Sequence, residues 1–97
     1  MKFLVINRPR AELPRGLGAD SDAVAGHANA IEAALDDGTL EAAYAFIAGG
    51  SAYVINAKDT EDLAKRVRYD PLFRSSNTEI YPIAHAVDFL RAVADEI

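Results

Sequence analysis

The strand-like segments of this sequence are apolar on both sides, and this feature constrains the fold more than any other. Residues 3–6 contain no polar side chain, and residues 52–55 are likewise apolar or aromatic at every position. A sheet with one face in water alternates apolar and polar residues along each strand. We therefore expect both faces of the sheet to be covered.

Turn and capping signals divide the chain into a β-α-β-β-α-β series followed by one more helix. Gly49-Gly50 lies between two strand-like runs and predicts a hairpin, because glycine adopts the positive φ of a tight turn at little cost. The first strand is expected to stop at Asn7, the second helix to end before Pro71, and the last strand to lie at a sheet edge because Pro82 has no amide donor. The predicted strands are residues 3–6, 40–48, 51–57 and 78–83, and the predicted helices are residues 20–37, 61–69 and 86–97.

This order predicts a single α+β domain over residues 1–97, with a ferredoxin-like βαββαβ fold and an extra C-terminal helix. The two main helices cover only one face of its four-stranded antiparallel sheet. A second copy would cover the other face and form a dimeric α+β barrel, so we expect a homodimer. Nineteen of the apolar residues are alanine, which makes the core thin for a monomer. The alternative is that the C-terminal helix folds over the open face.

Composition argues against several classes of function. The chain has 97 residues, a net charge of −5 and no cysteine. An acidic chain is a poor partner for nucleic acid or an anionic membrane surface, and without cysteine there is no disulfide or thiolate nucleophile. No apolar run approaches the roughly 18 residues of a membrane span. We expect a soluble cytoplasmic protein that binds neither nucleic acid nor membrane.

Two residues form a candidate site because of their positions on the predicted helices. His27 borders the apolar stripe that runs through Val24 and Ile31, and the residues on its flank are alanines. Asp70 lies on the apolar side of the second helix at its C-terminus, where the helix dipole disfavours a negative charge. A carboxylate in such a place usually has a partner, and His27 and Arg66 are the two candidates.

A contact between His27 and Asp70 would create an acid/base catalyst. The carboxylate would hold the imidazole in one tautomer and raise its basicity, so that the ring exchanges protons near neutral pH. The simpler interpretations are that Asp70 caps its own loop and that His27 is a solvated histidine. No metal or organic cofactor is expected, because the sequence contains neither a phosphate-binding glycine loop nor a spaced set of metal ligands.

Several other residues are candidate substrate-binding groups. Tyr44, Tyr53 and Tyr69 are suited to half-buried sites, although tyrosine is also common in cores and interfaces. Asn56 interrupts the apolar pattern of the third strand and is a candidate hydrogen-bonding group for a ligand. His85 is expected to be structural or exposed. The N-terminal segment carries arginines that would attract a substrate carboxylate, namely Arg8, Arg10 and Arg15.

Short segments over about residues 20–84 resemble the muconolactone isomerase-like group of the dimeric α+β barrel superfamily. They are Asp37-Gly38-Thr39-Leu40-Glu41, Ala52-Tyr53-Val54-Ile55-Asn56-Ala57-Lys58-Asp59, Leu63, Asp70-Pro71-Leu72-Phe73 and Glu79-Ile80-Tyr81-Pro82-Ile83. The chain is also similar to the YCII-related family, in which a histidine early in the first helix and an Asp-Pro pair after the second form a proposed dyad. These features fall on His27 and Asp70. Muconolactone isomerases assemble into rings, so the resemblance allows a homodimer or a higher homo-oligomer.

The residues and the resemblance together predict a cofactor-free, isomerase-like enzyme that moves a proton on a carbonyl- or lactone-containing substrate, by isomerisation or cyclisation. The predicted catalytic residues are His27 and Asp70, and the predicted substrate-binding residues are Tyr44, Tyr53, Tyr69 and Asn56. The alternative is a non-catalytic, YCII-like module for ligand binding or assembly.

Overall fold

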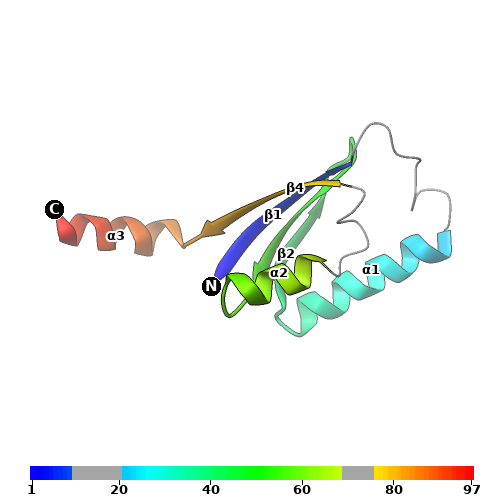
Figure 1. The fold of residues 1–97 in the computed structure, drawn as a ribbon, viewed down its shortest axis with the longest axis horizontal. Coiled ribbons are helices and arrows are strands. Elements are labelled where there is room, and N and C mark those ends of the chain that lie inside the picture. The colour runs from blue at the N-terminus through cyan, green and yellow to red at the C-terminus, as the bar shows by residue number, and fades with distance from the viewer. Residues whose placement is uncertain (10–20, 69–75) are drawn as a thin grey trace.

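The protein is built on a four-stranded sheet, with two helices on one face and a third helix that projects from the body (Figure 1). A computed structural model describes residues 1–9, 21–68 and 76–97. The elements are β1 (Lys2–Pro9), α1 (Ser21–Asp36), β2 (Leu40–Ala45), β3 (Ser51–Asn56), α2 (Thr60–Arg68), β4 (Ser76–Ile83) and α3 (Ala86–Glu96). The predicted ferredoxin-like α+β fold is confirmed.

The strands lie in the order β2-β3-β1-β4, and every neighbouring pair is antiparallel. Phe3 of β1 is paired with Ile55 of β3 on one side and with Pro82 of β4 on the other. β4 is the edge strand beside β1, so the missing amide donor of Pro82 costs no hydrogen bond to a strand on its other side. The predicted edge position of this strand is confirmed.

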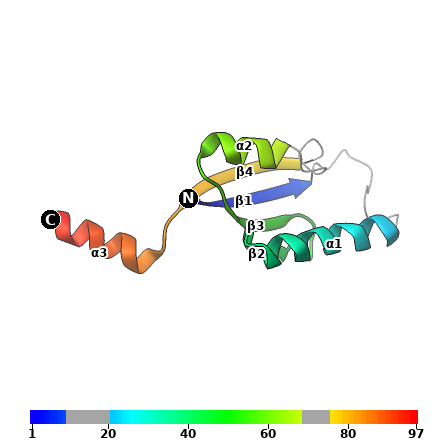
Figure 2. The same ribbon diagram turned by 90° about the horizontal axis from the view of Figure 1, so that it is seen from below.

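The buried core lies between α2 and the central strands, on the face where Figure 2 shows α2 over β1 and β4 and α1 beside β2 and β3. Leu63 and Val67 are four residues apart on α2, so they share one face and both are buried. Burying a side chain of this size contributes roughly 1.5–3 kcal/mol, and this pair therefore sets how α2 packs. The buried apolar residues are Phe3, Val5, Tyr53, Ile55, Ala57, Leu63 and Val67.

α1 is rotated relative to the predicted packing. Ile31 packs against the core, but Val24 is 46% exposed and Leu35 is 39% exposed. The prediction that the stripe through Val24 and Leu35 is the buried face is therefore wrong, since the half-buried residues are His27, Ile31 and Ala34. Alanine fills so many positions of this helix that the apolar pattern determines its rotation only weakly.

β1 is longer than predicted because Asn7 is accommodated inside the sheet. Asn7 is only 4% exposed, and its Nδ2 donates to Ser51 Oγ at 3.5 Å while its Oδ1 accepts from Thr78 Oγ1 at 2.9 Å. A buried amide with partners on both neighbouring strands does not end a strand. The predicted stop at Asn7 is therefore wrong.

The sheet face opposite the helices is apolar and uncovered. Leu4 is paired with Val54 and Tyr81, and Val54 is paired with Ala42, so these side chains share one face. The apolar residues of this open face are Leu4, Ile6, Ala42, Tyr44, Ala52, Val54, Tyr81 and Ile83, and the pairing places Lys2, Arg8, Asn56, Asn77 and Glu79 at its margins. A bulge between Leu40 and Ala42 turns Leu40 to the helix side, whereas the regular alternation of a strand would place both on one face. β2 also ends at Ala45, earlier than predicted.

α3 does not cover the open face. It extends away from the sheet (Figures 1 and 2), and none of its residues is buried. Val87, Phe89 and Leu90 are each more than half exposed. The alternative in which the C-terminal helix folds back over the sheet is therefore wrong. None of the described helices is long and apolar enough to cross a membrane.

Candidate functional site

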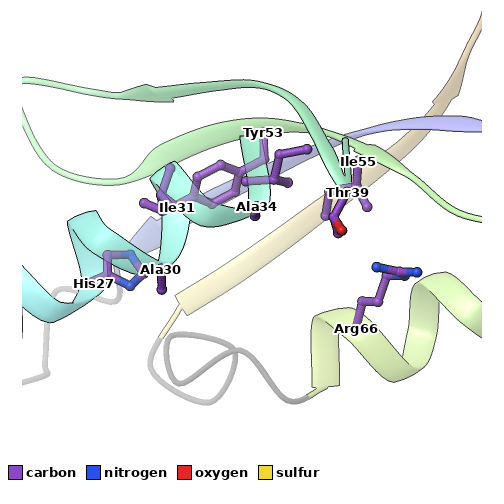
Figure 3. Close-up of a pocket in the computed structure, with 9 residues that line it drawn as sticks. His27, Ala30, Ile31, Ala34, Thr39, Tyr53, Ile55 and Arg66 are labelled. Carbon is purple, nitrogen blue, oxygen red and sulfur yellow. The ribbon is translucent and has the colours of Figure 1, made fainter. Parts of the chain in front are cut away.

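A pocket of about 240 Å³ lies between α1, α2 and the sheet (Figure 3). β3 supplies its floor, four residues of α1 supply one wall, and α2 supplies a single side chain opposite. The lining residues are His27, Ala30, Ile31, Ala34, Thr39, Leu40, Tyr53, Ile55 and Arg66. The small alanine side chains of α1 leave room for this pocket. Its lining is apolar apart from the polar groups of His27, Thr39, Tyr53 and Arg66.

His27 reaches the pocket because of helical periodicity. It lies three, four and seven residues before Ala30, Ile31 and Ala34, so all four project from one side of α1. The side chain is half-buried, and no residue in the described part of the chain hydrogen-bonds to its ring. The imidazole nitrogens therefore keep their hydrogen-bonding capacity for a ligand.

Tyr53 brings a second polar group to the same place. The residue is only 7% exposed, and Figure 3 shows its ring beside Ile31 and Ala34 of α1. Within the described residues no group hydrogen-bonds to the Tyr53 hydroxyl. Every fully buried side-chain oxygen or nitrogen of those residues has a partner, so this unpartnered hydroxyl must be accessible from the pocket. A tyrosine in a buried position normally bonds a partner through this group.

Arg66 is the cation among the pocket-lining residues. Its Nε donates to Asp62 Oδ1 at 3.4 Å, one helical turn back, and the Arg66 side chain is 40% exposed. Asp62 Oδ2 also accepts the Lys58 amide at 3.0 Å. This backbone hydrogen bond, assisted by the charge of Arg66, holds the pKa of Asp62 below its ordinary value. Sequence reasoning considered Arg66 only as a partner for Asp70, although its place three residues after Leu63 puts it beside the buried face.

The turn that joins α1 to β2 closes one end of the pocket and holds Thr39. The Thr39 amide donates to Asp37 Oδ1 at 2.8 Å, and hydrogen bonds from Thr39 hold the pKa of Asp37 below its ordinary value. The Asn56 side chain donates from Nδ2 to the carbonyl oxygen of Gly38 at 2.9 Å. Asn56 thus braces this turn, and it does not line the pocket.

The structure brings only part of the predicted site together. His27 and Tyr53 line one pocket, whereas Tyr44 is 70% exposed on the open face of the sheet. Tyr69 and Asp70 lie outside the described residues, so the predicted contact between His27 and Asp70 stays a prediction.

The predicted role of the N-terminal arginines stays a prediction. Arg8 is 59% exposed in an ion pair with Glu79 and does not line the pocket, and Arg10 and Arg15 lie outside the described residues. His85 is exposed, and its Nε2 lies 2.8 Å from Lys2 Nζ. The described residues contain no group of three or more side chains suited to holding a metal ion.

The fold is similar to that of a solved enzyme. The 5-chloro-2-hydroxyhydroquinone dehydrochlorinase TftG from Burkholderia phenoliruptrix AC1100, in complex with 2,5-dihydroxybenzoquinone, aligns with a TM-score of 0.69 at 18% sequence identity. The alignment covers 91% of this chain and 98% of that chain, and it shows a shared fold. No family model and no curated protein matches the sequence. Fold and pocket together define the chain as a ferredoxin-like α+β protein with a small, mainly apolar pocket.

Proposed function

We propose that this protein is a cofactor-free enzyme that moves a proton on a small carbonyl- or lactone-containing substrate. The observation that carries the proposal is the position of His27, an imidazole without a described hydrogen-bond partner at the wall of a mainly apolar pocket. An imidazole is suited to proton transfer near neutral pH. The enzymatic activity of the structural neighbour and the family resemblance support the same class.

The proposed reaction needs only acid/base chemistry. Neutral His27 takes a proton from a carbon next to the carbonyl, and the electrons of the C–H bond move onto the carbonyl oxygen to form an enolate. Where a C=C bond adjoins the carbon that lost the proton, this enolate is a dienolate, and the imidazolium returns the proton to the far carbon of that bond. The double bond moves by one position, so the product is an isomer of the substrate. The Tyr53 hydroxyl would donate a hydrogen bond to the enolate oxygen, which stabilises the charge as it develops.

Asp70 is the proposed orienting partner of His27. A carboxylate that accepts from one ring nitrogen leaves the other nitrogen free to act as the base. We expect Asp70→Asn to shift the tautomer balance of the His27 ring, as followed by nitrogen-15 chemical shifts, and to slow turnover. Unchanged ring shifts would remove Asp70 from the mechanism while leaving His27 in it.

The proposed function is tested by hydrogen exchange at carbon. A panel of monocyclic lactones and small keto acids is incubated with the protein in D2O, and deuterium at the positions next to each carbonyl is measured by NMR. We expect catalysed exchange for at least one compound and a loss of about 10²–10⁴-fold in His27→Ala, the usual contribution of a general acid/base. His85→Ala is the matched control, because it removes the other histidine, which is exposed and does not line the pocket.

Two results would contradict the enzyme proposal. The first is that no compound exchanges faster than in buffer, and the second is that His27→Ala exchanges as fast as the wild type. Either outcome favours the non-catalytic, YCII-like binding or assembly module, because the pocket and the open face would then serve binding alone.

We also propose that the protein acts as a homodimer, joined through the open faces of two sheets. All four strands contribute apolar side chains to this face, and α3 leaves it uncovered. Removing apolar surface from water contributes about 25 cal/mol per Å², so a second copy gains stability by covering it. A pair of such sheets is the arrangement that the dimeric α+β barrel superfamily implies, and a higher homo-oligomer would add contacts elsewhere.

A further inference from the structure

We infer that α3 is a dimerisation helix, and that the α3 helices of two copies pack against each other along one apolar side. This inference rests on the proposed homodimer and adds to it a contact that the open face does not supply. Four features carry it: the spacing of apolar residues on α3, the charges beside them, the surface that the chain exposes, and the position of α3 at the end of the open face.

The apolar residues of α3 are spaced as in a two-stranded coiled coil. Intervals of four, three and four residues separate the members of one apolar row, which we call the seam: Ala86, Leu90, Val93 and Ile97. This alternation places a continuous apolar stripe along one side of a helix. No residue of α3 is buried, and Leu90 and Ile97 are exposed. Nothing in the described part of the chain therefore covers the seam.

The charges of α3 allow a second copy of the helix to approach the seam. Asp88, Arg91 and Asp95 are three and four residues apart, so they share another side of the helix. Glu96 is the one charge beside the seam, and the other flanking positions are apolar, namely Val87, Phe89 and Ala94. Two copies can thus meet without bringing like charges together. An anionic membrane surface would instead meet three acidic side chains and a single arginine.

The chain exposes enough surface for an interface that includes α3. Its accessible surface is 7370 Å², whereas a compact monomer of 10.4 kDa exposes about 5,400 Å². The difference of roughly 2,000 Å² exceeds the roughly 800 Å² that each partner buries in a standard interface. Exposed large apolar side chains lie both on the open face and on α3, among them Tyr44, Tyr81, Ile83, Val87, Phe89 and Leu90.

α3 begins on the side of the sheet where the second copy would lie. Tyr81 and Ile83 of the open face are the last apolar residues of that face before α3 (Figure 1). Lys2 lies two residues before Leu4 on β1, so both belong to the open-face side. The Lys2 Nζ lies 2.8 Å from Nε2 of His85, the residue that precedes α3. The apolar surface of β4 therefore continues into α3 at the margin of the proposed interface.

Pairing of the two α3 helices fixes how the two copies are oriented. Open faces can be joined by a two-fold axis that runs either along the strands or across them. An axis along the strands brings the two β4 ends, and with them both α3 helices, to the same end of the dimer. An axis across the strands leaves the helices at opposite ends, where neither meets the other. The inference therefore requires the axis along the strands.

The inference is tested with single cysteines, because the chain contains none. Leu90→Cys places a thiol on the seam, where a packed pair brings the two Cα atoms within the roughly 4.4–6.8 Å of a disulfide. Arg91→Cys, on the charged side of the same turn, is the matched control. Both variants are oxidised by dioxygen with copper phenanthroline, so that two thiols form one disulfide and dioxygen takes up the electrons and protons.

We expect Leu90→Cys to yield a covalent dimer of twice the chain mass of 10.4 kDa. It should form about tenfold or more faster than from Arg91→Cys, because thiols in a packed pair react at a millimolar effective concentration. Its rate should not depend on protein concentration once the dimer has formed. Equal rates for the two variants, or a Leu90→Cys rate that rises in proportion to protein concentration, would overturn the inference.

A second measurement uses the strength of the dimer. Leu90→Glu buries a carboxylate in the seam without a partner, so the Kd of the dimer in sedimentation equilibrium should rise about tenfold or more. Ala92→Glu adds the same charge at an exposed position outside the seam and should leave the Kd unchanged. An unchanged Kd in Leu90→Glu contradicts a role of α3 in the dimer.

The α3 pair and the proposed function can fail separately. A wild type that is dimeric while Leu90→Cys does not cross-link would overturn the α3 pair and leave the open-face interface standing. Adding Val54→Glu to Leu90→Cys should slow cross-linking, and an unchanged rate would overturn the claim that both contacts belong to one dimer. If Leu90→Cys cross-links and no compound exchanges deuterium, the α3 pair stands and the enzyme proposal does not.

Discussion

Asn56 was predicted to bind a ligand, but in the structure its side chain stabilises a turn. A polar residue at the end of an apolar strand is a reasonable candidate for binding a ligand. In the structure its amide instead donates to the carbonyl oxygen of Gly38 at 2.9 Å. This bond ties the end of β3 to the turn after α1, and that turn carries Thr39 at the pocket wall.

Asn56→Ala is therefore expected to lower stability and to leave ligand binding unchanged. Losing one hydrogen bond of this kind costs about 0.5–1.5 kcal/mol, and each kcal/mol corresponds to a fall in Tm of roughly 4–8 °C in a domain of this size. Thermal unfolding measures the first effect, and the concentration dependence of deuterium exchange into the lactones and keto acids measures the second. Asn29→Ala, at an exposed position on α1, serves as the control. Loss of binding at an unchanged Tm would show that Asn56 contacts the ligand, as the sequence predicted.

The residues of the candidate site were predictable to different degrees. His27 was found because its place beside an apolar helix stripe is a local property of the sequence. Arg66 was named only as a candidate partner of Asp70 and not as a pocket residue, because that assignment requires the rotation of α2 and its distance from α1. Tyr44 and Tyr53 look alike in sequence, and only the pairing of β2 with β3 shows that they lie on opposite faces of the sheet.

At the scale of elements, the turn between β2 and β3 depends on two glycines that are not equivalent. Gly49 has φ 113° and Gly50 has φ 100°, values that residues with a side chain rarely adopt. A Cβ at Gly49 would meet Pro9 only at an ordinary 3.5 Å. A Cβ at Gly50 would clash with the carbonyl oxygen of Asn7, besides lying 3.2 Å from Phe46 Cδ2.

Gly50→Ala is therefore expected to destabilise the protein more than Gly49→Ala. The positive φ alone costs about 1–2 kcal/mol in either variant, and the clash at Gly50 adds to it because Asn7 is a buried, hydrogen-bonded residue of the central strand. Urea unfolding of both variants measures the difference. Equal losses of stability would mean that the hairpin shifts to relieve the clash, so that the close approach to Asn7 does not limit the turn.

The order of the elements was predictable from the sequence, but the packing of α1 and the length of β1 were not. Glycines and prolines mark the turns locally, so the β-α-β-β-α-β series and the edge position of Pro82 followed from the sequence. The buried side of α1 did not, because Val24 and His27 lie on adjoining sides of a helix in which alanine dominates. The length of β1 depended on hydrogen bonds from Asn7 to two other strands, and those partners are distant in sequence.

At the scale of the whole molecule, the apolar surface is divided between the open face and α3. Both lack cover in the single chain. Lys2 Nζ lies 2.6 Å from Glu41 Oε1 and 2.8 Å from Nε2 of His85, the residue that precedes α3. This cluster of polar bonds holds the start of α3 at the sheet. The Lys2 hydrogen bond also holds the pKa of Glu41 below its ordinary value, so the carboxylate stays charged and paired. α3 therefore begins at one end of the open face, and the rest of this face is uncovered.

Val54→Glu tests whether this open face joins two copies. Val54 lies between Leu4 and Ala42 near the middle of the face, so a carboxylate there would be buried without a partner in the dimer yet remain hydrated in the single chain. We expect the wild type to sediment at twice the chain mass of 10.4 kDa, and Val54→Glu to sediment as a monomer with its circular dichroism unchanged. Val24→Glu, at a 46% exposed valine on α1, should stay dimeric. A wild type that is monomeric at all concentrations, or a dimer that survives Val54→Glu, would mean that the open face does not form the interface, and dissociation by Val24→Glu would instead place the interface on α1.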